Sequence, residues 1–220
     1  MKSAKCLGVL LSGMLVLAGC NASVNSSIVV QDGESRSGNL MSVNGSVSVG
    51  EDCTINGTSK SVNGALQVGD RSRVEDLSTV NGSIQTGEGV IVSGDVASVN
   101  GPIGLGGGSE VSGRVVSVNG SIELVQTVVE RDVKTVNGNI RLRDGSVVKG
   151  DVVIDNKHSG SGRSQPLEIE VAGGSIIEGD VIVRRESVKV HLILREGGKV
   201  LGQVEGAEII DETAAKGLAP

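Results

Sequence analysis

The sequence predicts an all-β fold, a triangular parallel β-helix of 18–19-residue coils whose handedness it leaves open. Three observations lead to this prediction. The tripeptide Val-Asn-Gly recurs at a nearly constant spacing, the intervening segments are rich in Val, Ser, Thr and Gly, and the 220 residues include no Phe, Tyr or Trp. A core without aromatic rings must be built from Val, Ile, Leu and Ala, which suits a narrow tube in which each coil stacks on a similar neighbour.

Residues 1–19 are expected to be a signal peptide. Lys2 and Lys5 precede an apolar stretch, Leu7 to Leu17, that is too short to cross a bilayer. Removing this segment takes away two lysines and no acid, so the charge of the mature chain is 18 − 26 = −8. Without a polybasic block we expect no nucleic-acid partner, and without aromatic rings we expect no stacking site for bases or sugars.

The signal ends in Leu17-Ala18-Gly19-Cys20, which resembles the lipobox of bacterial lipoproteins. The resemblance implies cleavage before Cys20, acylation of that cysteine with palmitate-type chains, and a lipid anchor in the cell envelope. Asn21 follows instead of Asp, which in Gram-negative lipoproteins favours transfer to the outer membrane. A plain secretory signal ending near Ala18-Gly19 is the alternative.

Cys53 is the cysteine that is left once Cys6 leaves with the signal and Cys20 carries lipid. No intrachain disulfide can then form. Cys53 falls in an inward position of the repeat, beside Ile55, where we expect a small buried apolar side chain and not a reactive thiol.

The β-helix domain is expected over residues 23–204, after a lipidated anchor and short linker at 20–22. Val-Asn-Gly occurs six times, at steps of 19, 18, 19, 19 and 18 residues, with degenerate copies around Asn25 and Asn156. Because Asn tolerates turn conformations and Gly reaches positive φ, each copy predicts a corner, and stacked corners predict a ladder of side-chain amides that serves structure alone. The corner residues are Asn44, Asn63, Asn81, Asn100, Asn119 and Asn137.

Each coil is predicted to contain three short strands, and the 19-residue coils to place their extra residue in a bulge, for example at Ala97-Ser98. The valine before each corner has two interpretations. A six-residue rule, which we favour because Lys60 and Lys134 in the next column must face water, buries it. Strict alternation would turn it outward and create an apolar stripe that could bind a partner. The column contains Val43, Val62, Val80, Val99, Val118 and Val136.

The repeat is interrupted by a polar loop insertion at 157–166, and residues 205–220 are expected to form a loose tail or a short capping helix. Between them lies a basic edge on an otherwise acidic rod. It is either a charged edge that blocks further strand pairing or a docking site for acidic lipid or polymer. Its residues are Arg184, Arg185, Lys189 and His191.

Nothing in the sequence predicts an enzyme, a metal or a cofactor. His158, in the insertion, invites comparison with hexapeptide-type acyltransferases, which use a histidine between subunits, but no second catalytic group lies near it. Single carboxylates such as Asp95, Asp151 and Asp180 are expected on separate corners, and the calcium-binding nonapeptide does not occur.

The run Ser117–Leu124 (SVNGSIEL), with corners of the Gly94-Asp95-Val96 type between such runs, resembles the bacterial adhesin-type β-strand-repeat family. The resemblance covers about residues 23–205. It implies a non-enzymatic envelope lipoprotein that acts as a rigid adhesin or scaffold and contacts the membrane and an envelope polymer. The chain is also similar to the polymer-forming bactofilin group, whose β-helices assemble end to end, so that the partner would be another copy. The export signal and the insertion depart from the usual bactofilin pattern.

Overall fold

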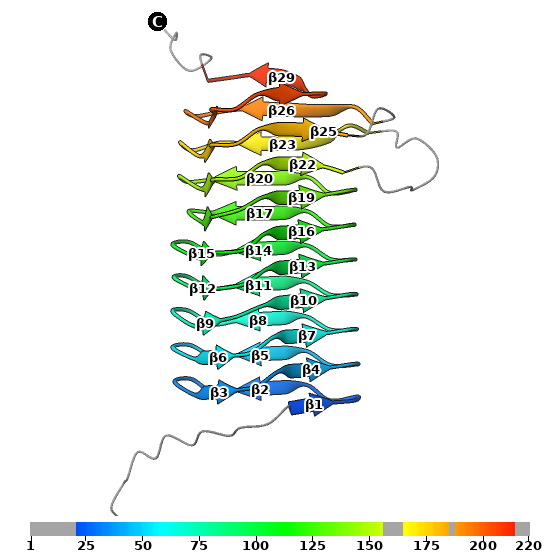
Figure 1. Ribbon diagram of the computed structural model, residues 1–220, viewed down its shortest axis with the longest axis vertical. Coiled ribbons are helices and arrows are strands. Elements are labelled where there is room, and N and C mark those ends of the chain that lie inside the picture. The colour runs from blue at the N-terminus through cyan, green and yellow to red at the C-terminus, as the bar shows by residue number, and fades with distance from the viewer. Residues whose placement is uncertain (1–20, 156–164, 185–187, 214–220) are drawn as a thin grey trace, which may run out of the picture.

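The computed structural model describes residues 21–155, 165–184 and 188–213. They form a parallel β-helix in which three parallel sheets run the length of a straight rod (Figure 1). Each coil contributes one strand to each sheet, so strands three apart in the chain are neighbours in space. The predicted fold class, an all-β solenoid of triangular cross-section with coils of about 19 residues, is confirmed.

Sheet 1 contains the strand that precedes each Val-Asn-Gly corner. Its ten strands are β1 (Asn21–Ser23), β4 (Leu40–Ser42), β7 (Ser59–Ser61), β10 (Leu77–Thr79), β13 (Val96–Ser98), β16 (Val115–Ser117), β19 (Val133–Thr135), β22 (Val152–Ile154), β25 (Val181–Val183) and β28 (Val204–Glu205). Corner 1, the Val-Asn-Gly corner, leads from sheet 1 into sheet 2.

Sheet 2 follows corner 1 and contains the longest strands. Its ten strands are β2 (Ile28–Val30), β5 (Val47–Val49), β8 (Leu66–Val68), β11 (Ile84–Thr86), β14 (Ile103–Leu105), β17 (Ile122–Val125), β20 (Ile140–Arg143), β23 (Leu167–Val171), β26 (Val190–Leu194) and β29 (Glu208–Asp211). Corner 2, which leads from sheet 2 into sheet 3, contains most of the residues with positive φ. It has positive φ at Asp52 (53°), Arg71 (56°) and Gly89 (64°), among others.

Sheet 3 closes the triangle, and corner 3 returns from it to sheet 1. Its nine strands are β3 (Ser35–Ser37), β6 (Thr54–Asn56), β9 (Arg73–Val74), β12 (Ile91–Val92), β15 (Glu110–Val111), β18 (Val128–Val129), β21 (Val147–Val148), β24 (Ile176–Ile177) and β27 (Lys199–Val200). From β9 to β24 these strands have only two residues, of which the first faces outward and the second is buried.

The core is a stack of aliphatic side chains from all three sheets. On sheet 2 the inward isoleucines Ile84, Ile103 and Ile122 pair with one another in register and are fully buried. Parallel pairing at about 4.8 Å per coil keeps identical positions in contact, so each layer needs only a few branched side chains. This geometry explains how the chain builds a continuous core without an aromatic ring.

The two coil lengths arise at a corner. Ser59 pairs with Leu77, an offset of 18 residues, whereas Leu77 pairs with Val96, an offset of 19. Sheet 3 of the same turn keeps the longer offset, since Thr54 pairs with Arg73. This shorter coil therefore loses its residue at corner 3. The second 18-residue coil loses its residue at corner 2, since Ile103 pairs with Ile122 at an offset of 19 but Glu110 pairs with Val128 at an offset of 18. In both cases the residue is lost where the chain turns, and the strands stay in register.

Three expectations about element boundaries were wrong. The bulge at Ala97-Ser98 is absent, because both residues lie in β13 and pair one to one with β10 and β16. No free linker separates Cys20 from the rod, because β1 begins at Asn21 and already pairs with β4. The repeat also extends past residue 204, because β29 adds a further strand to sheet 2 up to Asp211.

Candidate functional surface

Corner 1 carries a continuous ladder of asparagine side chains. Asn44 Nδ2 donates to Asn25 Oδ1 at 2.6 Å, and each later asparagine of the series donates to the preceding one at 2.8 Å, as far as Asn137. The side chain of each coil thus hydrogen-bonds to its neighbours below and above. The bonds run parallel to the rod axis and tie the coils together outside the sheets.

The glycine of corner 1 is required by close packing. None of these glycines has positive φ, contrary to the conformational reason that the sequence suggested. A Cβ atom on Gly64 would instead lie 2.2 Å from the carbonyl oxygen of Gly45, the equivalent residue of the preceding coil. Any side chain would therefore separate the coils at this corner.

The residue before the valine faces the interior, and its hydroxyl has a fixed partner. Ser61 Oγ donates to the carbonyl oxygen of Gly45 at 2.9 Å, and Ser98 Oγ donates to that of Gly82 at 3.2 Å. The bond satisfies a corner carbonyl that lies inside the rod. Ser or Thr, Val, Asn and Gly thus have four separate roles in one corner.

The valine column of corner 1 faces outward, so the burial that we favoured was wrong. Strict alternation was right for the valine, but it does not extend to the asparagine that follows, because Asn100 is exposed like Val99. Val43 and Val99 are 42% and 39% exposed, and Val136 alone in this column is buried. The inward place is taken by the serine whose hydroxyl bonds to the neighbouring coil. Lys60 and Val62 lie two residues apart and therefore share the outward side.

These valines form part of an apolar strip along the outside of sheet 1, which we call the sheet-1 strip. It follows the rod axis beside the asparagine ladder, with Lys60 and Ser78 between its apolar members. Exposed apolar area that is contiguous over several coils is typical of an interaction surface. The strip consists of Met41, Val43, Val62, Val80, Ala97, Val99, Val116 and Val118.

The aspartates of corner 3 serve the backbone. Each stands singly at corner 3 of its own coil. In the coil after Asp95 the same position is Arg114, whose N–H donates to Asp95 Oδ1 at 2.8 Å. That bond and the Arg114 guanidinium lower the pKa of Asp95. Asp151 Oδ1 accepts the N–H of Asp180 in the same way, at 2.9 Å. Among the described residues, no group of three His, Cys, Asp or Glu side chains is arranged to hold a metal ion.

The basic edge is interleaved with acids. His191 Nε2 lies 3.6 Å from Glu208 Oε2, and Arg184 Nη1 lies 4.0 Å from Asp155 Oδ1. Lys189 is exposed, whereas Arg185 lies outside the described residues. Partners of opposite charge reduce the net positive potential that an acidic lipid or polymer would meet here.

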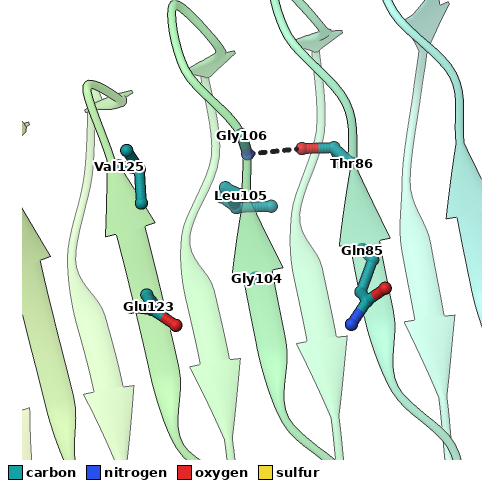
Figure 2. Close-up of a pocket in the computed structure, with 7 residues that line it drawn as sticks. All are labelled: Gln85, Thr86, Gly104, Leu105, Gly106, Glu123 and Val125. Atoms are coloured by element: carbon teal, nitrogen blue, oxygen red, sulfur yellow. Dashed lines mark hydrogen bonds between the residues drawn. The ribbon is translucent and has the colours of Figure 1, made fainter.

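A shallow depression of about 210 Å³ lies on the outer face of sheet 2 (Figure 2). Gln85 and Glu123 stand on either side of Gly104, where an added Cβ would meet nothing within 4 Å. The Gly106 N–H donates to Thr86 Oγ1 at 3.1 Å. Glu123 is the only acid that lines the depression, so the lining supplies no pair of groups for acid–base chemistry.

Cys53 is buried, as expected, but it behaves as a polar residue. Its Sγ donates to the carbonyl oxygen of Gln31 at 3.0 Å, and its own N–H donates to Ser72 Oγ at 2.9 Å. Ser72, one coil on, makes the corresponding hydroxyl bond to Gly50. Three other sites of interest, Cys20, His158 and Asn156, and most of the 157–166 insertion lie outside the described residues.

No family model matches this chain, and no match was found among curated proteins or solved structures. In the part of the chain that the structure describes, no helical segment has the length and apolar character needed to span a membrane. The β-helix itself is compatible with structural roles.

Proposed function

We propose that this protein is a lipid-anchored component of the bacterial cell envelope, in the outer membrane of a Gram-negative host. In this proposal the β-helix is a non-enzymatic, rigid rod for adhesion or scaffolding. The observation that supports it most directly is the unbroken stacking of β1 to β29 in three sheets of ten, ten and nine strands.

Rigidity follows from the number of bonds that any bend would break. Each interior coil is hydrogen-bonded to its neighbours through three sheets, and the asparagine ladder adds a fourth line of bonds from Asn25 to Asn137. At about 4.8 Å per coil, ten coils extend roughly 45 Å. Such a rod holds its far end at a fixed distance from whatever carries its near end.

The anchor is supported by the sequence Leu17-Ala18-Gly19-Cys20 and by the position of the first strand. Since β1 begins at Asn21, lipid on Cys20 would be attached directly to the end of the rod. Two or more acyl chains make such an anchor stable. The rod would then project from the membrane without a flexible tether.

Intact-mass measurement of the protein extracted from the envelope tests the anchor. We expect the mature chain to start at Cys20 and to carry the mass of two or three acyl chains, and we expect a Cys20→Ala variant to carry none. A mature wild-type chain with no added acyl mass would contradict the anchor.

A register-preserving deletion tests the structural role. Removing residues 82–100 joins Asn81 to Gly101 and shortens the rod by one 19-residue coil. If the protein acts by presenting a surface at a distance, the shortened rod should stay folded and lose adhesion of cells to a surface, or binding to isolated envelope polymer, in a length-dependent way. Two results would contradict this role. One is equal adhesion and binding by the full-length and the shortened rod, and the other is equal adhesion by cells that lack the protein.

A second candidate function is end-to-end assembly, as in polymer-forming β-helices. It is favoured by the C-terminal end, where β27, β28 and β29 are edge strands and Ile209 is 55% exposed. The N-terminal end differs, because Arg36 stands in the inward column of sheet 3 and pairs with Glu34 at 2.9 Å. Sedimentation and negative-stain imaging distinguish the two functions. Concentration-dependent filaments would support assembly, and a strict monomer would exclude it.

A further inference from the structure

The exposed apolar side chains of this protein are concentrated at the N-terminal end of the rod. Of the seven large apolar residues that are exposed in the described chain, four lie between residues 24 and 43. Val24 and Val29 are 68% and 52% exposed, and Met41 and Val43 are each 42% exposed. We call these four residues the basal girdle.

The basal girdle lies on both sides of corner 1. Val24 and Val43 stand at that corner directly before Asn25 and Asn44, Met41 projects from the middle of β4 on sheet 1, and Val29 projects from the middle of β2 on sheet 2. Two of the three faces of the first coil therefore present apolar side chains to their surroundings. Higher on the rod the same two faces carry Lys60, Glu123 and other charges.

The segments that form the same two faces contain no charged residue. Residues 21–31 and 37–50 contain no Asp, Glu, Lys or Arg. The charged residues of the first coil, Asp32, Glu34 and Arg36, belong to corner 2 or sheet 3. The Arg36 guanidinium is neutralised by Glu34 at 2.9 Å and also donates to the carbonyl oxygen of Val29 at 3.3 Å. A surface that is apolar and uncharged on one side and charged on the other matches the headgroup boundary of a bilayer.

We propose that the basal girdle seats the first coil of the rod in the headgroup region of a lipid bilayer. This inference rests on the proposed lipid anchor. Cys20 is bonded directly to Asn21, the first residue of β1, so the Cα atom of the acylated residue would lie about 3.8 Å from that of the first residue of the rod. At that distance the end of the rod must contact the membrane. The uncharged side enters the headgroup region at the lowest free-energy cost, because it carries no charge that must lose its hydration.

The girdle also determines how the rod stands. Contact through corner 1 tilts the rod toward that corner and lifts corner 2, with its acids Asp32, Glu51 and Asp52, away from the anionic headgroups. The sheet-1 strip then rises from the membrane on the side toward which the rod leans. Lipid and girdle together orient the rod as well as retain it.

The test compares two positions of one column. Val43 and Val99 have almost equal exposure and lie three coils apart, which is about 14 Å along the rod. Each is replaced by cysteine, Val43→Cys or Val99→Cys, in a Cys53→Ser background and labelled with an environment-sensitive fluorophore. The lipidated proteins are reconstituted into vesicles of phosphatidylethanolamine and phosphatidylglycerol that contain lipids with a nitroxide in the headgroup region.

We expect the nitroxide lipids to quench the label at position 43 several-fold more strongly than the label at position 99. Equal, weak quenching at both positions in protein of verified acyl mass would overturn the girdle and leave the anchor intact. Absence of acyl mass from the wild-type protein would overturn the anchor and, with it, this inference. Met41→Cys provides a second position within the girdle, for which the same strong quenching is expected.

Discussion

A Cβ atom on Gly120 would lie 2.0 Å from the carbonyl oxygen of Gly101, the equivalent residue one coil earlier. The two glycines are therefore held in a contact that no other residue type allows. The coils approach so closely at corner 1 because the asparagine ladder and the hydroxyl of Ser117, which donates to Gly101, draw them together at the same place.

Gly120→Ala is expected to destabilise the rod by about 2–3 kcal/mol, because the added methyl group must push two coils apart. Gly104→Ala is the matched control. Its Cβ would meet nothing within 4 Å and its φ is not positive, so we expect a change of no more than about 0.5 kcal/mol. Thermal unfolding by circular dichroism measures both, and a similar loss in the two variants would contradict the close-contact explanation.

Ser59→Ala is expected to stabilise the protein by about 1 kcal/mol. Ser59 Oγ is buried without a hydrogen-bond partner in an inward column between Leu40 and Leu77. Ser61→Ala, two residues on, is expected to cost about 1 kcal/mol because its hydroxyl bonds to Gly45. Denaturant unfolding measures the two changes, whose opposite signs are the critical result.

Asn100→Ala is expected to cost about 1–2 kcal/mol, because it removes the bonds to Asn81 and from Asn119. Val99→Ser, at the neighbouring outward position, should change stability by less than about 0.5 kcal/mol. If the valine substitution proved the more damaging of the two, the outward orientation of its column would be wrong.

Cys53→Ser is expected to preserve the fold, because the column already contains Ser72 making the same kind of bond. Burial raises the pKa of the Cys53 thiol in the folded protein. As pH rises, the unfolded chain therefore loses the thiol proton before the folded protein does. The contribution of Cys53 to the free energy of unfolding is fully present below the ordinary thiol pKa of 9.0 and is lost as pH rises above it. Unfolding experiments between pH 7 and pH 10 should show this loss in the wild type and a smaller loss in Cys53→Ser. A thiol reagent should modify Cys53 only upon unfolding.

Charge at the C-terminal end is expected to limit end-to-end assembly. A symmetric antiparallel pairing of two β29 strands would place Glu208 of one copy opposite Asp211 of the other. The double variant Glu208→Gln, Asp211→Asn should therefore associate at lower concentration than the wild type in analytical ultracentrifugation. Unchanged association would show that repulsion between these acids does not limit end-to-end assembly.

The coil length, the number of strands per coil and the position of corner 1 follow from the spacing of Val-Asn-Gly alone, because stacked parallel strands require each coil to repeat its neighbour. The burial of Cys53 was predictable from the same register. The outward direction of the valine column and the roles of Ser98 and Gly101 were not predictable from the sequence, because each depends on contacts with atoms about one coil away. Ser98 meets Gly82, 16 residues earlier, and Gly101 meets Gly82 across 19 residues.

The lack of aromatic residues was enough to predict an aliphatic tube, since rings would not fit its layers. Where that tube leaves apolar side chains exposed was decided by the stacking. Alternation along sheet 1 turns the valines outward, and the end of the stack leaves Val24 and Val29 uncovered beside Cys20. The sequence repeat is thus enough to predict the structure of one coil. The exposed surface depends in addition on which side of each strand faces the interior and on which coil lies at the end of the stack, without a neighbour to cover it.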